Sequence, residues 1–249
     1  MWGNQICAVV LAAGRGTRLR PLTELRPKAL CPVGNVALVD HALARVAGAD
    51  VAVNAHHLGE ALVEHLSGAV HVSWERDEPL GTAGALGALR DWIDGRHVLV
   101  VNSDAFHPPD LSDLVSGWDG ERVRLRCVRD PGRADFEGLR FAGASLMPWA
   151  AVRDLAPVPS GLYEVVWRHH DLDMHVASGP FFDCGTPREY LDANLAASGG
   201  ESVIGEGARI EGEVIRSVVW PGGVVAEGER LVEAIRVGDH LTVETSGRP

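Results

Sequence analysis

Apolar and polar positions alternate in two ways along the first 200 residues. Short, continuous apolar runs are typical of strands buried on both faces, and the segments between them repeat apolar residues at helical spacing. The expected strands are 6–12, 51–54, 70–74, 97–102 and 123–128. The expected helices are 39–46, 58–66, 83–92 and 111–118. This alternation predicts a doubly wound α/β domain with a parallel sheet.

The pattern changes near residue 201. Before it, 139–146 and 172–184 are expected as further strands, and 187–197 as a helix with proline in its first turn. After it, β-branched residues recur about every six positions with glycines between them, which predicts a short hexapeptide-type β-helix. The residues expected to stack inward are Val203, Ile210, Ile215, Val219 and Val225. A hairpin meander is the alternative. The expected domains are therefore 1–200 and 201–249.

Composition limits the function classes. The 23 Lys and Arg residues against 34 Asp and Glu give a net charge of −11, which argues against a nucleic-acid binder. No apolar run approaches the roughly 20 residues of a membrane span. The four cysteines are scattered, so we expect buried thiols in a reducing cytoplasm rather than disulfides or a zinc site.

The stretch from Leu11 to Thr23 follows the first strand and contains Gly14 and Gly16. Alanines and glycines at this place let backbone N–H groups approach an anion. Leu19 stands where a dinucleotide fingerprint needs its third glycine, and the loop lacks the Gly-Lys-Ser/Thr of a P-loop. The cations gathered around the loop are Arg15, Arg18, Arg20 and Lys28. They favour a polyphosphate ligand, with a solvated turn as the alternative.

Asp104 follows the apolar strand 97–102, so its carboxylate is expected at the same sheet edge as the glycine loop. Hard oxygen ligands suit Mg²⁺, which prefers one or two carboxylates together with phosphate oxygens and water. A capping or turn role is the alternative for Asp104 alone.

Together, the loop from Leu11 to Thr23 and the stretch from Pro27 to Leu30 resemble the signature of the sugar-phosphate nucleotidyltransferases, the nucleotide-sugar pyrophosphorylases. The resemblance extends over nearly the whole chain. It implies a Rossmann-like, doubly wound mixed sheet followed by a short left-handed β-helix. It also implies transfer of a nucleotidyl group from a nucleoside triphosphate to a sugar 1-phosphate, with release of pyrophosphate. Asp104 and Asp183 are the implied Mg²⁺ ligands, although Phe181 replaces the usual tryptophan of the second motif.

The resemblance also assigns roles to single residues. Arg18 is expected to hold the departing pyrophosphate, and Lys28 to neutralise the two reacting phosphates. The expected nucleotide-binding residues are Leu11, Ala12, Ala13, Gly14, Gly16, Thr17, Glu78, Gly81 and Thr82. Within this set Glu78 is expected to read the base edge, with simple solvation as its alternative. Thr82 is equally suited to capping the helix that follows it.

Sugar recognition is implied for Asn54, which lies in an Asn-x-His stretch, and for Gly143, which lies in a glycine-containing strand. Glu164 is a further candidate for a sugar hydroxyl, or a residue on a solvated helix face. The Glu-Lys-Pro stretch usual in the family is missing. We expect GTP with mannose 1-phosphate or a related hexose phosphate, and otherwise UTP with N-acetylmuramate or glucose 1-phosphate. A non-catalytic regulatory homologue is the alternative of another class, and a cytoplasmic homo-oligomer is expected.

Overall fold

A computed structural model describes residues 5–107 and 111–245, which divide into two compact units. The first unit is built from the residues up to 15 and from 39 to 181. The second is built from residues 16 to 38 and from 182 onward. The chain therefore passes between the two units three times.

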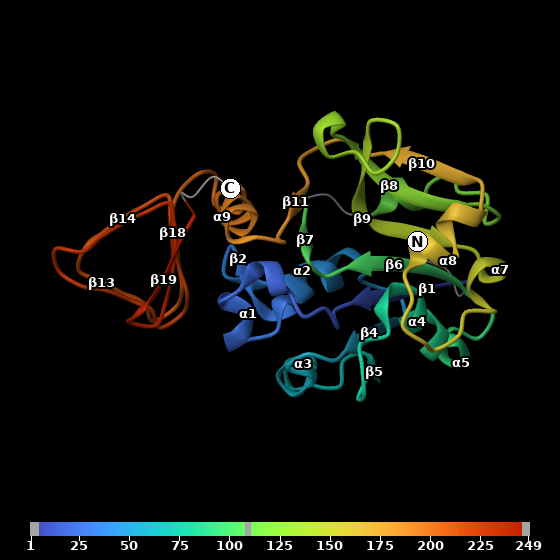
Figure 1. Ribbon diagram of the computed structural model, residues 1–249, viewed down its shortest axis with the longest axis horizontal. Helices are drawn as coiled ribbons and strands as arrows, with labels where there is room; N and C mark the ends of the chain where they lie inside the picture. The colour runs from blue at the N-terminus through green and yellow to red at the C-terminus, as the bar shows by residue number, and fades with distance from the viewer. Residues whose placement is uncertain (1–4, 108–110, 246–249) are drawn as a thin grey trace. The chain divides into compact units, whose positions relative to one another are not determined.

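The centre of the first unit is a seven-stranded mixed sheet in the order β10-β8-β9-β6-β1-β4-β5 (Figure 1). Its strands are β1 (Ile6–Leu11), β4 (Val51–Ala55), β5 (His71–Trp74), β6 (His97–Asn102), β8 (Val123–Arg129), β9 (Leu139–Met147) and β10 (Leu172–Val176). Four neighbouring pairs are parallel, whereas β9 runs antiparallel to both β6 and β8. The short connection from β8 to β9 leaves no room for a crossover helix, which explains the antiparallel pairing. The doubly wound mixed sheet that the resemblance implies is confirmed, whereas the parallel sheet predicted from the alternation alone is wrong at β9.

Both faces of the sheet are covered. Cys7, Ala8, Val9 and Val10 follow one another in β1 and are all fully buried. Since successive side chains on a strand point to opposite faces, neither face is open to water.

Four helices pack against one face of the sheet. They are α4 (Gly81–Ala88), α5 (Arg90–Ile93), α7 (Trp149–Val152) and α8 (Leu162–Val165), and they share one apolar cluster with the strands. Further α-helices in the described part of this unit are α2 (Leu38–Arg45), α3 (Gly59–Leu66) and α6 (Ser112–Val115). The first residue of α2, Leu38, is counted with the second unit. α3 lies beside β4.

Two predicted elements are interrupted in the structure. The helix expected over 83–92 begins at Gly81 and breaks at Leu89 into α4 and α5. The strand expected over 172–184 ends at Val176 and resumes as β11 (Phe182–Asp183), because Gly179 and Pro180 do not continue a ladder.

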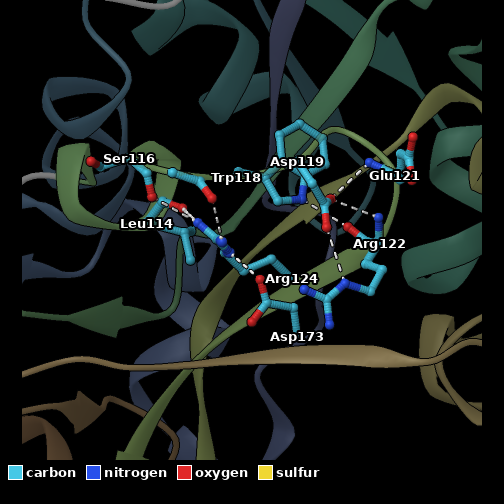
Figure 2. A network of polar contacts seen from close by, with 9 residues as sticks. Leu114, Ser116, Trp118, Asp119, Glu121, Arg122, Arg124 and Asp173 are labelled. Carbon is cyan, nitrogen blue, oxygen red and sulfur yellow. Dashed lines mark hydrogen bonds and ion pairs between the residues drawn. The ribbon is translucent and has the colours of Figure 1, made fainter.

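Arg124 on β8 fastens α6 and the turn after it to the edge of the sheet (Figure 2). Its guanidinium donates to the carbonyl oxygens of Leu114, Ser116 and Gly117 at 2.9–3.0 Å. Its Nε also donates to Asp173 on β10 at 2.7 Å. The carbonyl groups that end a short helix thereby gain partners, and the same side chain links the neighbouring strands β8 and β10.

The second unit begins with the loop after residue 15 and contains α1 (Leu22–Leu25) and a small hairpin of β2 (Pro32–Val33) and β3 (Val36–Ala37). The helix expected over 187–197 is α9 (Pro187–Ala197). Its N-cap, Thr186, accepts a hydrogen bond from the backbone N–H of Glu189. α9 lies beside β2.

The chain then winds into a β-helix (Figure 1). Successive coils pair in parallel along three ladders. The ladders consist of β12 (Val203–Ile204), β15 (Val218–Val219) and β18 (Ala234–Val237), then β13 (Arg209–Ile210) and β16 (Val224–Val225), and finally β14 (Glu213–Ile215) and β17 (Arg230–Val232). β19 (Leu241–Glu244) closes the last coil antiparallel to β18. The expected β-helix is confirmed, and the hairpin meander is excluded.

The interior of the β-helix differs in part from the expected stack. Val203, Val219 and Val225 are buried as expected, but Ile215 is half-buried and Ile210 is exposed. Ile210 pairs in register with the fully buried Val225, so both side chains point to the same side of the ladder. Ile210 is exposed because it lies in the first coil, whose strand β13 pairs on one side only within the part of the chain that the structure describes. The observed core consists of Val219, Val225 and Leu231, with Ala208 and Val214 packed against it.

All four cysteines are buried free thiols, as expected. Burial raises the pKa of the Cys7 and Cys127 thiols to about 11 and that of Cys31 to about 12, so these groups stay protonated at neutral pH. None of the helices in the described ranges combines the length and the apolar character that a membrane span requires. The expected domain boundary at residue 200 stays a prediction. The two compact units divide the chain elsewhere, at residues 15/16, 38/39 and 181/182.

Candidate active site

The first half of the glycine loop belongs to the first unit and leaves β1 at its carboxyl end. Ala12 and Ala13 are buried, whereas Gly14 is exposed. Ser103 donates its hydroxyl to the carbonyl oxygen of Leu11 at 2.8 Å, and the Ala12 N–H donates to the Asn54 side chain at 2.7 Å. A Cβ at Gly14 would meet no described atom within 4 Å. The loop is therefore anchored at its base and open at Gly14.

The second half of the loop belongs to the second unit, where Gly16 packs against Lys28. Gly16 has φ +59°, a left-handed conformation that favours glycine. A Cβ at this position would lie 2.8 Å from Thr23 Cγ2 and 3.1 Å from Lys28 Cβ. The Thr23 hydroxyl also donates to the Gly16 carbonyl oxygen at 2.9 Å. Lys28 is 7% exposed, so the loop holds a buried cation beside its second glycine.

Arg18 and Asp183 converge at Gly185, also within the second unit. Thr17 and Arg18 begin a 3₁₀ turn (Thr17–Leu19) that buried Leu19 anchors. A Cβ at Gly185 would lie 2.9 Å from Arg18 Nη2 and 3.0 Å from Asp183 Oδ1. The Arg18 guanidinium and the Asp183 carboxylate thus both border the space that a side chain at position 185 would fill.

Asp104 lies in the turn between β6 and β7 (Ala105–Phe106) and is half-buried. The residues after it are held by Arg45, which is itself 8% exposed. Arg45 donates to the Ala105 carbonyl oxygen at 3.1 Å and contacts His107 Nε2 at 3.0 Å. Burial, together with the charges of Arg45 and Arg126, lowers the pKa of His107 to about 2. His107 is therefore a neutral acceptor for Arg45, and the turn that carries Asp104 is held rigidly.

Gly143 lies in β9 beside this turn. Its φ is +71°, and a Cβ there would lie 3.3 Å from Ala105 Cβ and 3.6 Å from Asn102 Cβ. Glycine at this position therefore allows β9 to approach the end of β6 closely. Whether Gly143 also faces a sugar stays a prediction.

The turn between β5 and α4 is tied to residues near 160. Gly81 has φ +70°, and a Cβ there would lie 2.6 Å from the Ser160 carbonyl oxygen. That carbonyl accepts from the Ala83 N–H at 3.0 Å. The Thr82 hydroxyl accepts from the Leu162 N–H at 2.8 Å, so it serves the first turn of α8 rather than its own helix. Glycine at position 81 is thus required both by its φ and by the close backbone.

Glu78 and Glu164 are both exposed. The Glu164 carboxylate bends back over Gly161, the N-cap of its own helix α8, and fills the place that a Cβ would need there. This is the position of the acidic residue in a capping box. Sugar binding by Glu164 and base reading by Glu78 both stay predictions.

Asn54 is 3% exposed, and both ends of its amide group have partners. Its oxygen accepts from the Ala12 N–H, and its nitrogen donates to the Glu75 carboxylate at 2.7 Å. Sequence reasoning missed Glu75, which is 4% exposed. The sequence feature that could have indicated Glu75 is its position directly after β5, because β5 pairs with β4, which carries Asn54.

The expected site residues thus form separate groups. In the second unit, Gly16 lies against Lys28, and Arg18 and Asp183 both lie at Gly185. In the first unit, Ala12 is bonded to Asn54, and Gly143 lies against the residues flanking the Asp104 turn. A glycine loop after a strand, a buried lysine and carboxylates at strand ends are the kinds of group that phosphoryl-transfer sites use.

Comparison with known proteins agrees with this class. Residues 7–123 match the model of the nucleotidyl transferase family. The resemblance inferred from the sequence motifs is confirmed.

Individual relatives come from different branches. An N-acetylmuramate α-1-phosphate uridylyltransferase of Caulobacter vibrioides is 37% identical over 131 residues, which are 47% of this chain and 54% of the relative. A mannose-1-phosphate guanyltransferase of Schizosaccharomyces pombe is 28% identical over 229 residues, 74% of this chain and 62% of the relative. The chain therefore spans little more than half of these curated relatives.

A solved structure shares the fold over almost the whole chain. The Thermus thermophilus protein named mannose-1-phosphate geranyltransferase superposes with a TM-score of 0.71 at 20% identity. The match covers 96% of this chain and 95% of that one. At this identity the likeness shows the fold alone.

Proposed function

We propose that this chain is a sugar-1-phosphate nucleotidyltransferase, which joins a nucleoside triphosphate to a sugar 1-phosphate and releases pyrophosphate. The observation that carries the proposal is the burial of Lys28 against Gly16 in the glycine loop. Of the 23 Lys and Arg residues in the sequence, Lys28 is the only lysine. Its ammonium group is a compact point charge with three donors, which allows it to approach oxygens of more than one phosphate.

The chemistry needs no general base, because the sugar phosphate is already an anionic nucleophile at neutral pH. Catalysis then consists of positioning and charge neutralisation. Lys28 neutralises the two phosphates that react, and Arg18 holds the departing pyrophosphate by hydrogen bonds to its oxygens. The backbone N–H groups around Gly14 approach the phosphates where no side chain obstructs them.

Asp104 and Asp183 are the proposed Mg²⁺ ligands. Both are half-buried carboxylates, and Asp183 borders the space that the missing Cβ of Gly185 leaves open. Within residues 5–107 and 111–245, no three His, Cys, Asp or Glu side chains gather into a complete metal cage. This donor set fits Mg²⁺, which keeps water and phosphate oxygens among its ligands. When bound, the ion supplies further neutralisation of phosphate charge.

For the substrates, we propose GTP and mannose 1-phosphate or a related hexose phosphate. The guanyltransferase relative supports this choice over the longer stretch of the chain. The uridylyltransferase relative, with its higher identity over a shorter stretch, favours a second candidate, UTP with N-acetylmuramate 1-phosphate. Measuring pyrophosphate release with each nucleotide and each sugar phosphate in turn decides between the two. Release with none of them would favour the non-catalytic regulatory homologue.

We further propose that the enzyme works in the cytoplasm as a homo-oligomer. Four buried thiols with no disulfide are in keeping with a reducing compartment. Gel filtration of the full chain measures the assembly state, and a monomer at working concentration would remove the second part of this proposal.

Lys28→Ala is expected to lower turnover by at least about 100-fold, because one lost electrostatic contact to a reacting phosphate costs about 3–4 kcal/mol. Steady-state pyrophosphate release and the thermal midpoint are measured together, so that an unfolded variant is recognised. Arg209→Ala, which removes an exposed cation of β13, is the matched control and should retain full activity. A folded Lys28→Ala enzyme with unchanged turnover would overturn the proposed function.

A further inference from the structure

Glu75 is a buried carboxylate with both oxygens in use. It follows β5 directly and is 4% exposed. One oxygen, Oε1, accepts from Asn54 Nδ2 at 2.7 Å, and the other, Oε2, accepts from the Leu80 N–H at 2.7 Å. Hydrogen bonds to a buried charged group are stronger than those between neutral groups, so each of these contacts restrains its partner firmly.

The backbone of Glu75 is fixed as well. Its N–H donates to the Ala55 carbonyl oxygen at 2.9 Å, and its own carbonyl oxygen contacts His56 Nδ1 at 2.7 Å. The backbone of Glu75 is therefore held on both sides by residues at the end of β4 and just after it, and a shift of Glu75 would disturb several hydrogen bonds at once.

Asn54 continues the chain of contacts to the glycine loop. Its amide oxygen accepts from the Ala12 N–H at 2.7 Å. Three hydrogen bonds thus connect Ala12, at the start of the glycine loop, with Leu80, the residue before Gly81. All four residues lie in the first unit.

We propose that Glu75 is a positioning residue that holds the phosphate-binding loop and the base-binding turn at the separation a nucleoside triphosphate requires. This inference rests on the proposed function, which assigns Ala12 and Gly81 to the nucleotide. Glu75 acts through Asn54 and Leu80 and does not itself touch the substrate.

The requirement for one carboxylate follows from counting donors. Both ends of the chain of contacts, the Ala12 and Leu80 N–H groups, are donors. Two amide side chains between them always leave one donor facing another donor, whichever way the amides are turned. One amide and one carboxylate satisfy every contact, in either order. Glu75→Gln and Asn54→Asp therefore each create one mismatch, and the double exchange removes it.

Glu75→Gln is expected to raise the KM for the nucleoside triphosphate by about tenfold or more, because a mismatched buried polar group changes an equilibrium constant by about that factor. Turnover at saturation should stay within about threefold, and the KM for the sugar phosphate should not change. The double variant Asn54→Asp with Glu75→Gln should return the nucleotide KM to within about threefold of the parent enzyme. Asp77→Asn, an exposed carboxylate in the same turn, is the control for loss of charge.

Two outcomes overturn the positioning role alone, provided that the parent enzyme releases pyrophosphate. The first is an unchanged nucleotide KM in folded Glu75→Gln. The second is a nucleotide KM that stays raised in the folded double variant, and this measurement decides the matter if Glu75→Gln fails to fold. A parent enzyme that releases no pyrophosphate with any nucleotide would overturn the proposed function, and the positioning role with it.

Discussion

Gly185 matters through the side chain that it lacks. The atoms nearest to its missing Cβ are Arg18 Nη2 and Asp183 Oδ1, which are ends of flexible side chains rather than backbone. An added methyl group therefore leaves the backbone in place, but it displaces two groups to which the proposed function assigns phosphate and metal binding. Activity and stability are therefore expected to separate at this residue.

Gly185→Ala is expected to lower kcat/KM by at least about tenfold while the thermal midpoint changes by no more than about 4 °C. Steady-state kinetics and thermal unfolding of the same preparation check this. Gly132→Ala is the matched control, because a Cβ there makes only an ordinary contact of 3.7 Å with Asp130. A loss of stability as large as the loss of activity would contradict the separation.

His107 makes the folded chain sensitive to acid. Its pKa is lowered to about 2 in the fold, mainly by burial, whereas an unfolded histidine titrates near its ordinary value of 6.5. Below that value the unfolded state binds a proton that the folded state does not, so the free energy of unfolding falls as the pH falls.

Between pH 7 and pH 5 this difference is expected to remove about 2 kcal/mol of unfolding free energy. His107→Gln, which keeps an acceptor for Arg45, should lose correspondingly less over the same interval. Urea unfolding of both proteins at each pH measures the difference, and parallel pH dependences would show that His107 titrates normally in the fold.

Among the elements, α9 is joined to the β-helix and to the hairpin by one hydroxyl. Tyr190 is fully buried, donates to the Pro32 carbonyl oxygen and accepts from Trp220 Nε1. The guanidinium of Arg26 lies 4.3 Å from the centre of the Trp220 ring. The segment that leads to Lys28 is thereby packed against the β-helix inside the second unit.

Tyr190→Phe is expected to lower the unfolding free energy by about 1–3 kcal/mol, because it leaves a buried acceptor and a buried donor without their partner. Urea unfolding measures the change. Tyr163→Phe is the control, since Tyr163 is the other of the two tyrosines and is 47% exposed. Equal stability of the two variants would show that the hydroxyl contributes nothing.

Strands and helices were predictable where one pattern dominated. The run from Ile6 and the pattern over 187–197 each correspond to a single element. The break at Leu89 was not predictable, because it depends on packing: Gly84 and Gly87 in the same helix lie against the backbone of residues 156–158. The exposure of Ile210 follows from its place in the first coil, and the spacing of β-branched residues does not show where the stack of coils begins.

The site was predictable only in part, for a similar reason. Glycines and cations close together in sequence were recognisable, and so was a carboxylate after an apolar strand. Glu75 lies among the charged residues from Glu75 to Glu78 and resembles a solvated turn. Its role depends on Asn54, which lies in β4, and on Ala12, which follows β1.

At the scale of the whole molecule, the two units should differ in how they open. Trp220 is the only tryptophan of the second unit and is 1% exposed. Trp220→Ala is expected to cost about 3–5 kcal/mol. If each unit opens on its own, that loss affects the second unit alone.

Hydrogen exchange followed by mass spectrometry tests this. In Trp220→Ala, amides of residues 16–38 and 182–245 should exchange faster, whereas those of the seven-stranded sheet should keep their protection. Ile210→Ala, which shortens an exposed side chain of the same β-helix, is the control. An even rise across both units would mean that they open together.

The composition of the second unit has a consequence for synthesis. Its first segment, residues 16–38, leaves the ribosome long before α9 and the β-helix against which it packs. All strands of the first unit's sheet have been synthesised once residue 176 has emerged. The sheet is therefore able to form before the packing partners of residues 16–38 have been made. A nascent chain that stalls before residue 182 would carry a formed sheet and a Lys28 segment without its packing partners.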